Sequence, residues 1–171
     1  MVFTVLHYLA VAPLQFKFKN RVDPFALALS TILIDIEPLT GFFTGNYHWL
    51  LHSFTGAGLF SVLLAFAIFF LEKRNSFAAR LFYRLLRLER RRHGFGSILL
   101  TSVFGGVSHV FIDAFTHRSF PYVLFPFKAS ENPFWRGFEI GHLVQAIAVL
   151  LSLCSVYLWV RSIRELPHPE G

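Results

Sequence analysis

The feature that most constrains this chain is a set of long apolar runs in which charged residues are rare. Residues 54–71 form a run of 18 positions without a single charged side chain. As a helix this run rises about 27 Å, which nearly matches the roughly 30 Å hydrocarbon core of a bilayer. The pattern predicts that the chain spans a membrane as helices.

Three further runs favour the same interpretation. Residues 97–115 and 140–160 are each interrupted by two strongly polar side chains, and residues 23–43 carry two acids after their first residue. Residues 1–13 are apolar but short, and without a basic start or a small-residue cleavage site they do not match a signal peptide. We therefore expect a single all-α domain over residues 1–171. It is a polytopic membrane helix bundle of about four transmembrane helices, with a short N-terminal re-entrant or interfacial helix.

Composition disfavours several other classes of protein. Hydrophobic residues make up 54% of the chain and charged residues 15%, against about 25% charged in an average soluble domain. An ordinary soluble globule and a disordered chain are therefore disfavoured. The single cysteine, Cys154, rules out an internal disulfide and a cysteine-rich zinc module.

The basic charge is concentrated in one segment between two of the apolar runs. Residues 72–92 hold eight basic and two acidic side chains, which equals the net charge of +6 of the whole protein. Helical spacing puts four arginines on one face: Arg80, Arg84, Arg87 and Arg91. We expect a basic amphipathic helix within residues 72–93 that lies on anionic lipid at the cytoplasmic face, and we do not expect a nucleic-acid partner.

The distribution of basic residues also predicts the orientation. With residues 72–92 in the cytoplasm, 13 of the 16 lysines and arginines lie inside and three lie outside, as the positive-inside rule requires. The protein is then an integral protein of the cell membrane. Its polar intramembrane residues fall at a similar depth towards the extracytoplasmic side, below an aromatic segment at residues 116–139.

Polar side chains inside these runs indicate a shared site. A charge at the centre of a membrane helix costs about 2.5–3.5 kcal/mol, so carboxylates there need partners. His109, Asp113 and His117 follow one another at steps of four and therefore share one helical face. The full set of candidate metal ligands is His7, Asp35, His48, His52, His109, Asp113, His117, Glu139 and His142.

The chemistry of these donors predicts which metals they bind. Imidazoles and carboxylates without a thiolate suit zinc, and also iron or manganese. Because one zinc ion takes about four ligands, a set of this size predicts two or three ions. A single histidine or aspartate in a span also serves as a hydrogen-bonding contact between helices, and that alternative stays open for each residue taken alone.

These motifs resemble those of the YdjM-like, LexA-regulated membrane-bound metal-dependent hydrolases. The resemblance is carried by Ser108-His109-x3-Asp113 within residues 105–117, by residues 122–127, by the opening Phe3-Thr4-x-x-His7, by residues 34–38 and by the His48/His52 segment. It covers most of residues 1–145. That family is in turn similar to zinc-dependent phospholipase C and the S1/P1-type nucleases, helical enzymes whose trinuclear zinc site cleaves phosphoesters.

The resemblance implies a ligand order along the chain. The implied ligands are His7, Asp35, His52 or less closely His48, the pair His109 and Asp113, and then His117 and His142. In this order Asp113 would bridge two ions. Glu139 precedes His142 here, whereas the phospholipases end in His-x3-Glu, so the last position departs from the family pattern.

The hypothesis from the sequence is a membrane-embedded, phospholipase C-like zinc hydrolase. It would cleave a phosphoester of a lipid or lipid-linked substrate with a metal-activated water, which Asp35 or Glu37 would orient or deprotonate. A haem-binding protein and an ion- or proton-translocating protein stay as alternatives, because facing histidines and intramembrane carboxylates also serve those functions.

Overall fold

The structure, a computed structural model, describes residues 4–44, 50–74 and 76–165. Every regular element in these ranges is helical, which confirms the all-α prediction. The elements are α1 (Thr4–Val11), α2 (Pro13–Lys17), α3 (Pro24–Ile32), the 3-10 helix η1 (Leu33–Asp35), α4 (Ile36–Thr44), α5 (Phe54–Lys73), α6 (Phe77–Leu85), α7 (Phe95–Thr116) and α8 (Phe138–Arg164).

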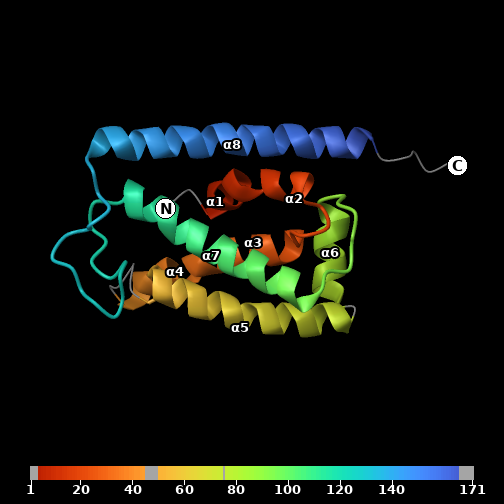
Figure 1. Ribbon diagram of the computed structural model, residues 1–171, viewed down its shortest axis with the longest axis horizontal. Coiled ribbons are helices and arrows are strands. Elements are labelled where there is room, and N and C mark those ends of the chain that lie inside the picture. Colours follow the sequence, from red (N-terminus) through yellow and green to blue (C-terminus); the bar gives the residue numbers. More distant parts are fainter. Residues whose placement is uncertain (1–3, 45–49, 75, 166–171) are drawn as a thin grey trace, which may run out of the picture.

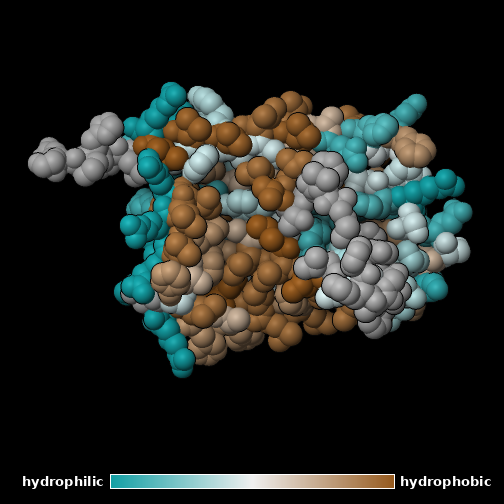
Figure 2. Space-filling view, turned by 180° about the vertical axis from the view of Figure 1, so that it is seen from behind, coloured by the Kyte–Doolittle hydropathy of each residue, from teal (hydrophilic) through white to brown (hydrophobic). Residues whose placement is uncertain are grey.

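Within these ranges, three helices are long and apolar enough to cross a membrane, namely α5, α7 and α8. They run along the long axis of the molecule, with α7 between the other two (Figure 1). Figure 2 shows the corresponding surface, an apolar band across the middle with hydrophilic residues gathered at both ends. This is the surface that a protein embedded in a bilayer requires.

The fourth predicted span, residues 23–43, is not a single helix. It is divided into α3, η1 and α4, so the described part of the chain has three long apolar helices where about four spans were expected. Pro38 explains part of the break, because it has no backbone N–H to donate to the carbonyl of residue 34. α3 is largely buried by protein, which is where a broken helix is tolerated at membrane depth.

Two adjacent glycines let α7 approach both of its main neighbours. A Cβ atom on Gly105 would collide with Ser30 Oγ on α3, and a Cβ atom on Gly106 would collide with Ser61 Oγ on α5. Small residues at such positions allow the close packing on which membrane helices depend. His109 lies one turn further along α7 and is therefore held close to α3.

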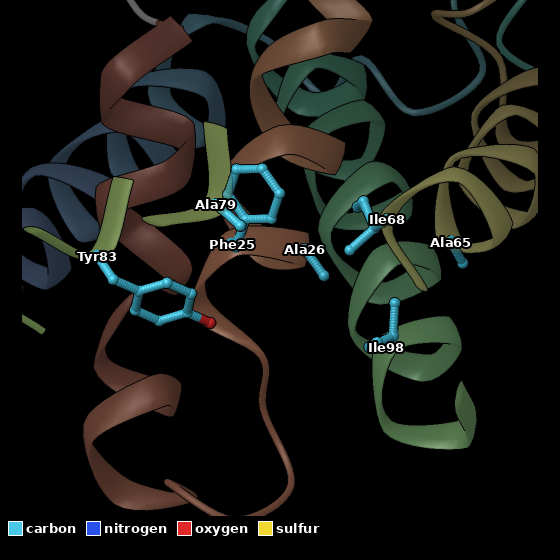
Figure 3. Packing of buried hydrophobic residues seen from close by; sticks show 7 residues of the cluster. All are labelled: Phe25, Ala26, Ala65, Ile68, Ala79, Tyr83 and Ile98. Atoms are coloured by element: carbon cyan, nitrogen blue, oxygen red, sulfur yellow. The ribbon is translucent and has the colours of Figure 1, made fainter. Parts of the chain in front are cut away.

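A hydrophobic core cluster joins α6 to the bundle. Figure 3 shows its seven members, which come from α3, α5, α6 and α7: Phe25, Ala26, Ala65, Ile68, Ala79, Tyr83 and Ile98. Because α6 contributes Ala79 and Tyr83, it is fixed by packing at one end of the molecule. Figure 1 shows that it runs across the ends of the long helices instead of along them.

The predicted basic helix is shorter than its arginine spacing suggests. α6 ends at Leu85, so Arg87 and Arg91 do not share its face, and that part of the prediction is wrong. The helix is closed by a Schellman motif, in which the Leu88 N–H donates to the Tyr83 carbonyl and the Arg87 N–H to the Arg84 carbonyl. Arg87 takes the left-handed conformation of this motif, with φ of 48°.

Candidate metal centre

Five of the predicted ligands meet in one buried cluster. They come from four places in the chain: His7 from α1, Asp35 from η1, His52 from the segment before α5, and His109 and Asp113 from α7. His52 and His109 are fully buried, and His7 and Asp113 nearly so. The Asp35 side chain is 24% exposed and lies at the accessible edge of the cluster.

The two carboxylates lie between the imidazoles. Asp113 Oδ1 is 3.0 Å from His7 Nε2, and Asp113 Oδ2 is 3.2 Å from His109 Nε2 and 3.8 Å from His52 Nε2. Asp35 Oδ1 is 3.3 Å from His52 Nε2 and 3.4 Å from His109 Nε2. All three Nε2 atoms therefore face the same small volume.

Two groups of three donors are compact enough to hold a metal ion. One is His7, Asp35 and His109, and the other is His52, His109 and Asp113. Within each group the donor atoms lie within 4.8 Å of one another. Each group combines two imidazoles with one carboxylate, a donor set that suits zinc, iron or manganese.

A backbone contact of His109 fixes which of its nitrogens faces the cluster. Nδ1 lies 2.8 Å from the Thr31 carbonyl oxygen, an acceptor, so Nδ1 carries the proton and donates it. Nε2 is fully buried and lies 3.2 Å from Asp113 Oδ2 and 3.4 Å from Asp35 Oδ1. In a neutral ring, Nε2 would direct a lone pair at these carboxylate oxygens, and a cation between them would satisfy all three groups.

His52 is oriented in the same way by Glu37. The Glu37 carboxylate lies 2.9 Å from His52 Nδ1 and also accepts hydrogen bonds from the backbone N–H groups of Leu50, Leu51 and His52. This places Glu37 behind the His52 ring, away from the Nε2 atom that faces the cluster. A carboxylate behind a ligand imidazole is the usual arrangement around bound metals.

The carboxylates of Asp35 and Glu37 also affect the pKa of His52. Burial lowers the pKa of His52, but its hydrogen bonds to Asp35 and Glu37 more than offset that effect, so the pKa is raised above its ordinary value. The carboxylates therefore favour positive charge at this position.

His117 lies at the edge of the cluster. Its Nδ1 is 3.5 Å from Asp113 Oδ1 and its side chain is 44% exposed. α7 ends at Thr116, and His117 follows it with an extended backbone. Of the three residues predicted to share one helical face, only His109 and Asp113 therefore do so. The His117 ring lies near Phe120, which also contacts the His52 ring.

Two other predicted ligands are not brought into these groups. Glu139 and His142 lie exposed in the first turns of α8, and neither belongs to the two groups of donors. His48 lies outside the described residues. The Thr31 carbonyl was missed by sequence reasoning, because a backbone oxygen carries no signal in the residue type.

Comparison with known proteins gives a family without an assigned activity. A model for the domain of unknown function DUF4184 matches residues 1–169, so the chain belongs to this family. Neither curated proteins nor solved structures gave a match.

Proposed function

We propose that this member of the DUF4184 family is a membrane-embedded, metal-dependent hydrolase of phosphoesters. The observation that supports it best is the convergence of the buried Nε2 atom of His109 with the carboxylates of Asp35 and Asp113. Carboxylates and imidazoles that converge in a buried site are donors arranged for a cation. Resemblance to the YdjM-like hydrolases points to the same chemistry.

The residues fit a site in which Asp113 is shared by two ions. His52 and His109 approach Asp113 Oδ2, and His7 and His117 approach Asp113 Oδ1. Because one imidazole nitrogen binds one ion, the two groups of donors that share His109 cannot both be occupied in full. Zinc is the proposed metal, and when bound it lowers the pKa of a water towards about 7 and polarises phosphoester oxygens.

The accessible edge of the cluster assigns roles to individual side chains. Asp35 is the more exposed of the two central carboxylates, which suits it to orient a water and to accept its proton. His117 is partly exposed at the same edge, where it can hold a proton for the leaving oxygen. Glu37, which lies behind His52, is proposed to position that ligand and not to act on the water.

The surroundings of the site favour a lipid or lipid-linked substrate. The cluster is built on α7, a helix long and apolar enough to span a bilayer. The segment after α7 lines a cavity of about 400 Å³ with Arg118, Phe120, Glu131, Trp135 and Phe138, among others, and the Phe120 ring also lies beside the His52 ring. Arg118 offers a guanidinium for a phosphate, and the aromatic rings offer contacts for apolar chains.

Metal analysis of the detergent-purified protein tests the proposal. We expect one or two equivalents of zinc or another divalent metal in the wild type, and less than half of that in His109→Ala and Asp113→Ala. His142→Ala is the matched control, because its imidazole lies exposed on α8, and it is expected to keep the metal. A metal-free wild type with intact helices would contradict the proposal, and a Soret absorption band would favour the haem alternative.

An activity screen then tests the reaction. The metal-loaded protein is expected to hydrolyse chromogenic phosphomonoesters, phosphodiesters or phospholipids, and to lose this activity when a chelator removes the metal. Asp35→Asn is expected to reduce turnover by about 10²-fold or more, as for loss of a general base, while it keeps part of the metal. Turnover that survives metal removal would contradict the proposal.

A further inference from the structure

The end of the molecule that carries α6 has the surface of a helix lying in a membrane interface. Phe77, Leu81 and Leu85 follow one another at steps of four on the outer side of α6 and are 71%, 38% and 69% exposed. Arg80 and Arg84 lie exposed beside this stripe. An exposed apolar stripe flanked by arginines is typical of helices that rest at the boundary between acyl chains and headgroups.

A basic cavity adjoins α6 at the same end. It has a volume of about 430 Å³ and is lined by Phe69, Glu72, Lys73, Arg90, Arg91, Arg92 and His93. Four lysine and arginine side chains and one acid thus line this cavity. The cavity begins where α5, one of the three long apolar helices, ends.

The walls of this cavity are held in place by contacts within the protein. Arg91 binds both Asn20 and Glu89, which fixes the segment after α6 against the segment before α3. His93 is buried, and its Nε2 is 3.9 Å from the buried carboxylate of Asp23. The Lys73 ammonium lies 4.6 Å from the centre of the Phe69 ring, which places the charge directly beside an apolar wall.

We propose that this cavity binds the phosphate headgroup of an anionic phospholipid. Guanidinium groups match phosphate oxygens in charge and geometry, and three consecutive arginines line the cavity. The acyl chains would lie along the exposed apolar side of α5, where Phe66 and Phe70 are 47% and 58% exposed. A lipid fits better than a soluble phosphate, because the cations lie where the long apolar helix α5 ends, at the same end of the molecule as the apolar stripe of α6 (Figure 1).

Lipid binding by the full-length, detergent-purified protein tests this site. Native mass spectrometry with phosphatidylglycerol and phosphatidylcholine is expected to show at least tenfold tighter binding of phosphatidylglycerol. The double variant R90Q/R92Q is expected to lose at least fivefold of this affinity. The matched control is K128Q/R136Q, which removes the same charge from exposed positions in the segment between α7 and α8.

Each result decides the proposal. Equal binding of the two lipids, or the same loss in the control as in R90Q/R92Q, would overturn it. Displacement of phosphatidylglycerol by millimolar inorganic phosphate, with tight phosphate binding on its own, would also overturn it in favour of a soluble anion.

If the double variant loses helical structure by circular dichroism, R92Q alone provides the test, with an expected loss of about twofold in affinity for phosphatidylglycerol. Metal content is expected to be unchanged in every variant, which separates this site from the metal centre.

Discussion

His109 donates its Nδ1–H to the backbone carbonyl of Thr31 over 2.8 Å, and this bond ties a candidate ligand on α7 to the last turn of α3. Carbonyls in the last turn of a helix lack partners within that helix. The break after Ile32, which divides the predicted span, therefore leaves an acceptor at the position where His109 needs one. Both the stability of the protein and the orientation of His109 therefore depend on how closely these two helices approach.

Gly105→Ala is expected to lower both stability and metal content. The added methyl would collide with Ser30 Oγ and move α7 away from α3, which weakens the contact of His109 with Thr31. Such overpacking costs about 1–3 kcal/mol, to be measured as a fall in the unfolding midpoint together with metal content. Gly58→Ala is the matched control on α5, because its Cβ would meet open space. It is expected to be neutral or up to about 1 kcal/mol stabilising.

Glu37→Gln is expected to weaken metal binding without disrupting the fold. The amide has nearly the shape of the carboxylate but cannot supply its negative charge to His52 Nδ1 and to three backbone N–H groups. Loss of such an outer partner typically costs 10- to 100-fold in metal affinity, which competition with a chromogenic chelator measures. Glu139→Gln on the exposed start of α8 should change nothing. Unchanged affinity with abolished turnover would instead assign Glu37 a direct role in the reaction.

Arg87→Gly is expected to stabilise the protein by about 0.5–1 kcal/mol. Arg87 holds the left-handed position of the Schellman motif, with φ of 48°, where a side chain is strained and glycine is not. For a chain of this size that corresponds to a rise of about 2–4 °C in unfolding midpoint per kcal/mol. Arg84→Gly, within α6, removes the same side chain from a helical position and should lower the midpoint.

Tyr83 is expected to limit stability at alkaline pH. Burial, followed by the nearby carboxylates of Asp23 and Glu72, raises the pKa of its phenol well above the ordinary value. The unfolded chain ionises near pH 10 while the folded protein keeps the neutral phenol, so stability is present below pH 10 and is lost as the pH rises above it. Tyr83→Phe should show a smaller fall in unfolding midpoint between about pH 9 and pH 11. Tyr157→Phe, at an exposed position on α8, should behave like the wild type.

The long helices were predictable because hydrophobicity alone specifies them. Residues 54–71, 97–115 and 140–160 correspond to α5, α7 and α8 within a few positions. Residues 23–43 have the same apolar character, but Pro38 and the packing of α3 inside the bundle prevent one continuous helix. The length of α6 was not predictable either, because a left-handed arginine at its end leaves no mark in the residue pattern.

The candidate site was predictable in its residue types but not in its geometry. Steps of four along α7 correctly placed His109 and Asp113 on one face, and five predicted ligands converge. The orientation of His52 depends on Glu37 and on three backbone groups, and that of His109 depends on a carbonyl in another helix. Such contacts follow from the tertiary packing, which the spacing of residues does not contain.

The 3.0 Å contact between His7 and Asp113 joins positions that are 106 residues apart in the chain. A ribosome must therefore extend the polypeptide through α7 before the donor set exists at all. Nascent chains that stall before Asp113, and N-terminal fragments that end before it, lack the donor set, whatever local helices they form. The ratio of bound ion to polypeptide would accordingly report, in a growing cell, the fraction of molecules that have completed their assembly.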